Sequence, residues 1–185
     1  MTVAISLLRA VNVGRANRIS MAALRAIYES LGVRNPQTYL QSGNVVFQSD
    51  ERRLRGLHER VEREIERNFG FRTGVIGRTA GELRDVVARS PFPGRRGIEP
   101  NKLLVVFLAS DPGAAARGRL RGLEAGSEEL QIHDRELYIY FPDGLARPKL
   151  SVPLLEKTLG TSGTGRNWNT VRKLAEFAQK LDFAL

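Results

Sequence analysis

Three polar segments carry the side chains whose chemistry most favours ligand binding. They lie at residues 8–14, 39–47 and 164–171 and supply arginines, amide side chains and the single tryptophan of the chain. Arginine pairs with anions through charge-assisted hydrogen bonds, and tryptophan stacks on rings and cations. Together with one lysine, the candidate ligand-binding residues are Arg9, Asn12, Gly14, Gln41, Ser42, Asn44, Lys149, Arg166, Asn167 and Trp168.

The first segment leads from a predicted strand into a loop that runs to a helix cap at Ser20. A glycine-bearing loop between a strand and a helix can present backbone N–H groups to an anion. Only Gly14 is available here, so the segment is not a phosphate-loop motif. In the alternative interpretation, Asn12 and Asn17 satisfy backbone groups of an ordered loop.

The second segment contains Ser42-Gly43, which favours a tight hairpin turn. The functional alternative is that Gln41 and Asn44 offer amide groups to a base edge or a sugar. A ferredoxin-like sheet can also bind RNA through aromatic side chains on its open face, for which Tyr39, Phe47 and the aromatic run from Tyr138 to Phe141 are candidates. The same residues also suit ordinary packing in a strand.

The third segment precedes the last predicted helix. Asn169 or Thr170 can cap that helix, and Trp168 can fix it to the core. Alternatively, Arg166, the two asparagines and the tryptophan bind an anion and a stacked ring at the helix N-terminus. Residues 161–165 are rich in glycine, serine and threonine, and we predict a loop there.

Catalytic groups are hard to find in the sequence. His58 and His133 share no motif, and we expect both to be solvated surface residues. Neither a serine-elbow motif nor a Walker loop is present. We therefore predict no catalytic residue, no metal site and no cofactor, while an acid–base pair assembled from distant carboxylates stays open.

The charge balance favours polyanionic partners. The formal net charge is +9, with 13 basic and 7 acidic residues in 1–78 and 16 and 13 in 79–185. Basic groups displace counterions from phosphates, so nucleic acid is one partner class that such a balance suits. Only five of the 29 basic residues are lysine, so genomic base composition is an alternative cause. Cysteine is absent, which excludes disulfides, a thiolate nucleophile and cysteine metal sites.

The elements that must position these segments follow a recognisable order in the first half. A strand at 3–8 is followed by a helix from Ser20, a hairpin at 37–48, one long amphipathic helix from Asp50 and a strand at 72–77. This β-α-β-β-α-β order is that of the ferredoxin-like fold.

The second half nearly repeats this order. It begins with a capping box at Thr79 to Glu82 and continues with a strand at 102–108 and a hairpin at 130–141. We predict helices where the first half has its last strand. The predicted fold is α+β: residues 1–78 form a ferredoxin-like half and residues 79–185 a second α+β half with C-terminal helices. Both halves pack into one compact body with antiparallel or mixed sheets and helices on one face.

The three polar segments, in this order and spacing, resemble a bacterial family called "domain of unknown function 1697" (DUF1697). The similarity also covers residues 102–108 and 148–150. The resemblance implies an α+β fold with ferredoxin-like halves in stand-alone bacterial proteins, and it implies no activity.

The function predicted from these observations is binding of nucleic acid or of a phosphorylated or anionic ligand in a polar cleft between the halves. One alternative is a small enzyme acting on a phosphorylated or nucleotide-like substrate, with Lys149 or Arg166 stabilising charge. Another is a protein-interaction module. The start reads as a strand rather than a signal peptide, and no apolar run suits a spanning helix. We therefore expect a cytoplasmic protein, monomeric by default, without a membrane partner.

Overall fold

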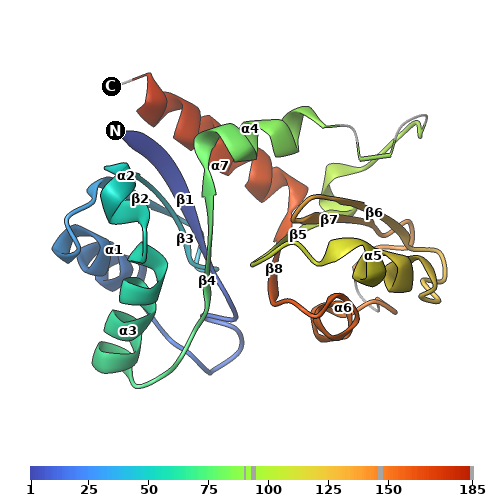
Figure 1. Ribbon diagram of the computed structural model, residues 1–185, viewed down its shortest axis with the longest axis horizontal. Coiled ribbons are helices and arrows are strands. Elements are labelled where there is room, and N and C mark those ends of the chain that lie inside the picture. Colours follow the sequence, from blue (N-terminus) through green and yellow to red (C-terminus); the bar gives the residue numbers. More distant parts are fainter. Residues whose placement is uncertain (90, 93–94, 146–147, 184–185) are drawn as a thin grey trace. The chain divides into compact units, whose positions relative to one another are not determined.

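The computed structural model describes residues 1–89, 91–92, 95–145 and 148–183. The chain divides into two compact units (Figure 1). Unit 1 comprises Met1–Asp85 and Lys173–Leu185, and unit 2 comprises Val86–Arg172. Each unit contains one four-stranded antiparallel sheet with helices packed against it, so the predicted α+β fold class is confirmed.

Unit 1 has the predicted β-α-β-β-α-β order, and its strands pair as β2-β3-β1-β4. The hairpin turn predicted at Ser42-Gly43 joins β2 to β3. Its elements are β1 (Thr2–Leu8), α1 (Met21–Ser30), β2 (Arg34–Tyr39), β3 (Asn44–Ser49), α2 (Glu51–Leu54), α3 (Leu57–Phe69), β4 (Val75–Thr79) and the start of α4 (Ala80–Ala88).

The core of unit 1 lies between the sheet and the helices α1 and α3. Side chains spaced three or four residues apart on each helix meet alternate residues of the strands. The tilted rings of Tyr28 and Phe47, with centroids 5.2 Å apart, lie in the middle of this layer. The cluster consists of Ala4, Leu8, Val11, Ile19, Leu24, Ile27, Tyr28, Val33, Val45, Phe47, Leu57, Val61, Ile65 and Val75.

The predicted long helix from Asp50 is two helices, so this prediction was wrong in its extent. The chain leaves the helix after Leu54 and begins α3 at Leu57. Gly56 between them has φ = +67°, a left-handed conformation that a right-handed helix cannot contain. Glu62 of α3 then accepts a hydrogen bond from the Val75 N–H at 2.7 Å, which connects α3 to β4.

The other face of this sheet meets the end of the chain. Helix α7 (Trp168–Asp182) contributes its last turns to unit 1. Phe177 lies edge-on to Tyr39 with ring centroids 5.5 Å apart, and Gln48 Nε2 donates to the Leu181 carbonyl at 3.0 Å. Phe47 lies in the core and Tyr39 packs on α7, so neither aromatic side chain belongs to an open sheet face.

Unit 2 repeats the element order of unit 1, and its strands pair as β6-β7-β5-β8. The capping box predicted for the start of the second half forms at the start of α4, which still belongs to unit 1: Glu82 Oε2 accepts from Thr79 N at 2.7 Å, and Thr79 Oγ1 accepts from Glu82 N at 3.2 Å. The further elements are η1 (Pro100–Lys102), β5 (Leu103–Leu108), α5 (Gly113–Arg121), β6 (Glu129–His133), β7 (Glu136–Tyr140), α6 (Val152–Leu159) and β8 (Gly163–Asn167).

Strand β8 corrects the prediction of a loop at 161–165 and of helices in place of a last strand. It pairs with β5 along its whole length. A Cβ at Gly163 would lie 2.8 Å from Val106 Cγ1, so the absent side chain makes room for the core beneath. In the described ranges, no helix is both long and apolar enough to cross a membrane.

Candidate functional site

Asn12 organises the loop between β1 and α1. Its φ is +55°, a left-handed conformation that asparagine tolerates better than most residues. Its Nδ2 donates to the Ile19 carbonyl at 2.9 Å and to the Gln41 carbonyl at 2.8 Å, and its Oδ1 accepts from Ile19 N at 2.9 Å. The side chain is therefore occupied with the backbone, and it ties the first polar segment to the second.

Asn44 and Gly43 fix the turn between β2 and β3. Asn44 is fully buried, and its Nδ2 donates to the Tyr39 carbonyl at 2.7 Å and to Ser42 Oγ at 3.0 Å. A Cβ at Gly43, where φ is +74°, would lie 2.8 Å from Leu8 Cβ, so only glycine lets the turn close on β1. We call residues 9–20 and 40–43 together the double loop.

The backbone of the double loop is held in unusual conformations. Ala10 and Leu40 have φ values of 48° and 57°, which cost energy for residues with these side chains. Two hydrogen bonds hold the conformation at Ala10. Asn17 Nδ2 donates to the Ala10 carbonyl at 3.1 Å, and Asn12 N donates to the Asn17 carbonyl at 3.0 Å. The double loop is therefore preorganised.

The double loop has a strong positive charge. It contains Arg9, Arg15 and Arg18 and no aspartate or glutamate. Arg9 is half-buried and packs along Gly74, where a Cβ would lie 3.1 Å from Arg9 Cδ. Arg15 and Arg18 are exposed, and neither forms an ion pair with any residue that the structure describes. The same two loops also contain Gly14, Gln41 and Ser42, all of which are exposed.

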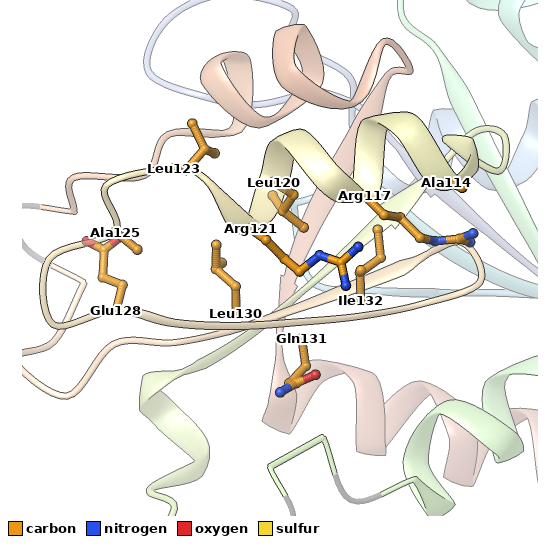
Figure 2. Close-up of a pocket in the computed structure, with 10 residues that line it drawn as sticks. All are labelled: Ala114, Arg117, Leu120, Arg121, Leu123, Ala125, Glu128, Leu130, Gln131 and Ile132. Carbon is orange, nitrogen blue, oxygen red and sulfur yellow. The ribbon is translucent and has the colours of Figure 1, made fainter.

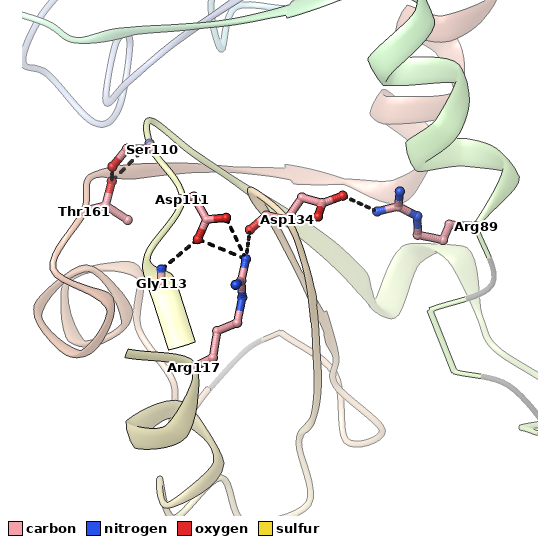
Figure 3. Close-up of polar contacts among 7 residues, drawn as sticks. All are labelled: Arg89, Ser110, Asp111, Gly113, Arg117, Asp134 and Thr161. Atoms are coloured by element: carbon pink, nitrogen blue, oxygen red, sulfur yellow. Dashed lines mark hydrogen bonds and ion pairs between the residues drawn. The ribbon is translucent and has the colours of Figure 1, made fainter. Parts of the chain in front are cut away.

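The equivalent loop of unit 2, between β5 and α5, is short and carries an acid. Figure 3 shows Asp111 accepting from Gly113 N at 2.7 Å and from Arg117, whose guanidinium nitrogen lies 3.0 Å away. The Gly113 N–H, followed by the Arg117 guanidinium, lowers the pKa of Asp111 below its usual value. Charge is balanced locally here, so the acid-free cationic loop is a feature of unit 1.

The third polar segment lies in unit 2 and is engaged in structure. Buried Arg166 donates from one terminal nitrogen to Thr164 Oγ1 at 2.8 Å and to the Gly165 carbonyl at 2.9 Å. Burial lowers the pKa of Arg166 to about 10. Trp168 is partly buried, with its ring centroid 6.4 Å from that of Tyr138.

Asn167 holds the start of α7. Its Oδ1 accepts from Asn169 N at 3.0 Å, and its Nδ2 donates to the Asn101 carbonyl at 3.0 Å. The side chain that accepts at this helix start is thus Asn167, rather than the predicted Asn169 or Thr170. Both ends of this amide bond to the backbone, as both ends of the Asn12 amide do.

Arg166 has a counterpart in unit 1 that sequence reasoning missed. Arg78 on β4 is buried and donates to the carbonyl of the preceding Gly77 at 2.7 Å, as Arg166 does to Gly165. Both arginines lie near the end of the strand that precedes α4 or α7. The Gly-Arg dipeptide occurs at both places, at 77–78 and 165–166, and this repeat could have indicated that the two arginines are equivalent.

Lys149 has an exposed side chain beside two acids. Its backbone N–H donates to Glu128 Oε1 at 2.6 Å, and a Cβ at Gly126 would lie 2.8 Å from its Cδ. Asp143 lines the same small hollow. These carboxylates reduce the net positive charge at Lys149. A single site that joins Lys149 and residues 166–168 of unit 2 to the double loop of unit 1 stays a prediction.

A family model described as "Protein of unknown function (DUF1697)" matches residues 1–138, which includes the whole double loop. The chain belongs to the DUF1697 family. The conserved bacterial protein SP0830 from Streptococcus pneumoniae has a similar fold, with a TM-score of 0.69 and 21% identity over 97% of this chain and 99% of that chain. At that identity the likeness shows the fold alone. No curated protein matches the sequence.

In this DUF1697 chain His58 and His133 are both partly buried, which corrects the prediction of two solvated side chains. His58 packs against β4 so closely that a Cβ at Gly77 would overlap the imidazole ring. Its Nε2 is buried and has no hydrogen-bond partner in the described part of the chain. Burial lowers the pKa of His58; the Glu59 carboxylate opposes this shift, and the nearby Arg78 charge adds to it.

This burial predicts a loss of stability on acidification. Because the pKa of His58 is lower in the folded state than its ordinary 6.5, the unfolded state binds the proton first as pH falls below about 6.5. Urea unfolding between pH 7.5 and 5 should show a smaller loss for His58→Gln than for the wild type. His133→Gln is the control and should follow the wild type. Parallel curves for all three proteins would refute a neutral, buried His58.

Proposed function

We propose that the chain binds a phosphate-bearing polyanion, nucleic acid being the leading class, on the double loop of unit 1. The observation that carries this proposal is the Asn12 side chain, which fixes two loops together and leaves Arg15 and Arg18 exposed without counter-charges in those loops. Arginine presents a planar fork of donors that matches phosphate oxygens.

Preorganisation supports this proposal energetically. A ligand that meets an ordered loop does not have to offset the entropy of ordering it. The hydrogen bonds at Asn12 and Asn17 and the close approach of Gly43 to Leu8 hold the backbone before any ligand arrives. Binding energy from the arginines is then available for affinity.

The composition of the double loop also predicts the type of binding. It contains no aromatic residue on which a base could stack. Contacts to phosphate position a nucleic acid without reading its sequence. We therefore expect weak, salt-dependent binding with little dependence on base sequence.

The test is a fluorescence-anisotropy titration of the full chain against labelled single-stranded DNA and RNA of mixed sequence. If Arg15 and Arg18 each neutralise one phosphate of a single strand, affinity should fall about sevenfold between about 50 and 200 mM salt. Lack of binding at the lower salt concentration, or an affinity that does not change with salt, would contradict the proposal. Either outcome would favour one of the two alternative predictions, a small enzyme or a protein-interaction module.

A further inference from the structure

A pocket of about 530 Å³ lies in unit 2 between helix α5 and strand β6. Figure 2 shows Leu130 and Ile132 pointing from β6 toward the helix, whereas Gln131 points to the opposite side of the strand. Leu120 supplies a buried wall, and Leu123 and Ala125 are partly buried at one end. Apolar and polar atoms contribute equally to the lining, and the volume of the pocket is in the size range of small-molecule sites.

The two units differ at this place. In unit 1 helix α1 packs directly on β2, whereas α5 packs mainly on α6. The connection from α5 to β6 spans residues 122–128, compared with residues 31–33 between α1 and β2. The longer connection allows α5 to lie toward α6, and the space beside β6 is the pocket.

The charges around the pocket leave one cation available. Arg117 donates to the Asp111 carboxylate and, at 3.0 Å, to the Asp134 carbonyl (Figure 3). Glu128 uses both carboxylate oxygens to accept from the Lys149 and Leu150 N–H groups. Exposed Arg121 has no ion pair or hydrogen bond with the residues of the described ranges, and Figure 2 shows its guanidinium between the helix and Ile132.

We propose that this pocket binds a small carboxylic acid with an apolar body. The carboxylate would pair with Arg121 through two parallel N–H···O bonds, and the apolar body would cover Leu120, Leu130 and Ile132. A neutral ligand would leave the Arg121 charge unused, so the head group sets the specificity. This site is independent of the double loop and does not rest on the function proposed above.

The probe is octanoate, titrated into the full chain and followed by ¹H–¹⁵N correlation spectra. We expect saturable shifts of the amides of α5 and β6. Arg121→Gln should weaken binding of octanoate by about tenfold or more, because it removes a charge-assisted hydrogen bond. Arg119→Gln removes the same charge from the same helix outside the pocket lining. It also removes an exposed hydrogen bond from Arg119 Nε to the Thr158 carbonyl, and it should leave the affinity unchanged.

Two further ligands distinguish the head groups. The neutral 1-octanol should bind to the wild type more weakly than octanoate does. Its affinity should be the same for the wild type and for Arg121→Gln, which also shows that this variant is folded. Octyl phosphate should bind no tighter than octanoate. Absence of octanoate binding, equal weakening by both arginine variants, or a clear preference for octyl phosphate would overturn the assignment.

Discussion

Leu57→Ala should lower the free energy of unfolding by about 2–5 kcal/mol, through the lost transfer energy of the side chain and the cavity left behind. Leu57 is fully buried at the start of α3 and belongs to the core cluster between this helix and the sheet of unit 1. Urea denaturation followed by circular dichroism measures the change.

Leu54→Ala is the matched control for this variant. Leu54 lies three residues earlier on α2 and is only partly buried against the same core, so the identical chemical change should cost less. A urea denaturation curve of Leu57→Ala that coincides with that of the wild type would show that Leu57 does not contribute to this core. A larger loss of unfolding free energy for Leu54→Ala than for Leu57→Ala would contradict the deeper burial of Leu57.

Reversing the charge of Arg15 and Arg18 together should weaken oligonucleotide binding by at least about tenfold at low salt, because two phosphate contacts become repulsive. The salt dependence should fall as well, by about one in the logarithmic slope for each arginine removed. The double variant Arg15→Glu/Arg18→Glu is compared with the wild type in the same anisotropy titration.

The control reverses two other exposed arginines of unit 1, Arg52 and Arg63, on α2 and α3. Neither forms an ion pair with a described residue, and both double variants lower the formal net charge from +9 to +5. The control should keep at least most of the affinity. Equal weakening by both double variants would mean that overall charge, rather than the double loop, attracts the polyanion.

Local signals in the sequence predicted the fold of unit 1 well. The cap at Ser20 is present, with its Oγ accepting from Ala23 N at 3.1 Å, and the Thr79–Glu82 capping box forms as predicted. Such motifs depend on residues three positions apart, which a sequence shows directly. The long amphipathic pattern after Asp50 correctly placed Leu57, Val61 and Ile65 on the buried face. It was wrong about Phe69, which is exposed, and did not reveal the break at Gly56.

Strand β8 was missed because its residues do not form strands by their own preference. Gly163 and Gly165 weaken a strand, and their place in the sheet depends on Leu104, Val106 and Leu108 of β5. That pairing is a tertiary property, so the period and composition of residues 161–165 indicated a loop.

The role of the amide side chains could not be decided from the sequence. Asn12 bonds to Gln41, 29 residues away, and to Ile19, so its structural role depends on contacts between loops. His58 is partly buried because glycine stands at position 77 on a neighbouring strand. In both cases the contact that decides the role of the side chain is with a residue distant in the sequence, which a local sequence pattern does not identify.

The location of binding is tested most directly by mapping backbone amide shifts while single-stranded DNA of mixed sequence is added at low salt to ¹⁵N-labelled full chain. The largest shifts should fall on residues 10–18 and 41–43, with the amides of α3 little changed. Shifts concentrated outside the double loop, with residues 10–18 and 41–43 unchanged at saturation, would contradict the proposed site.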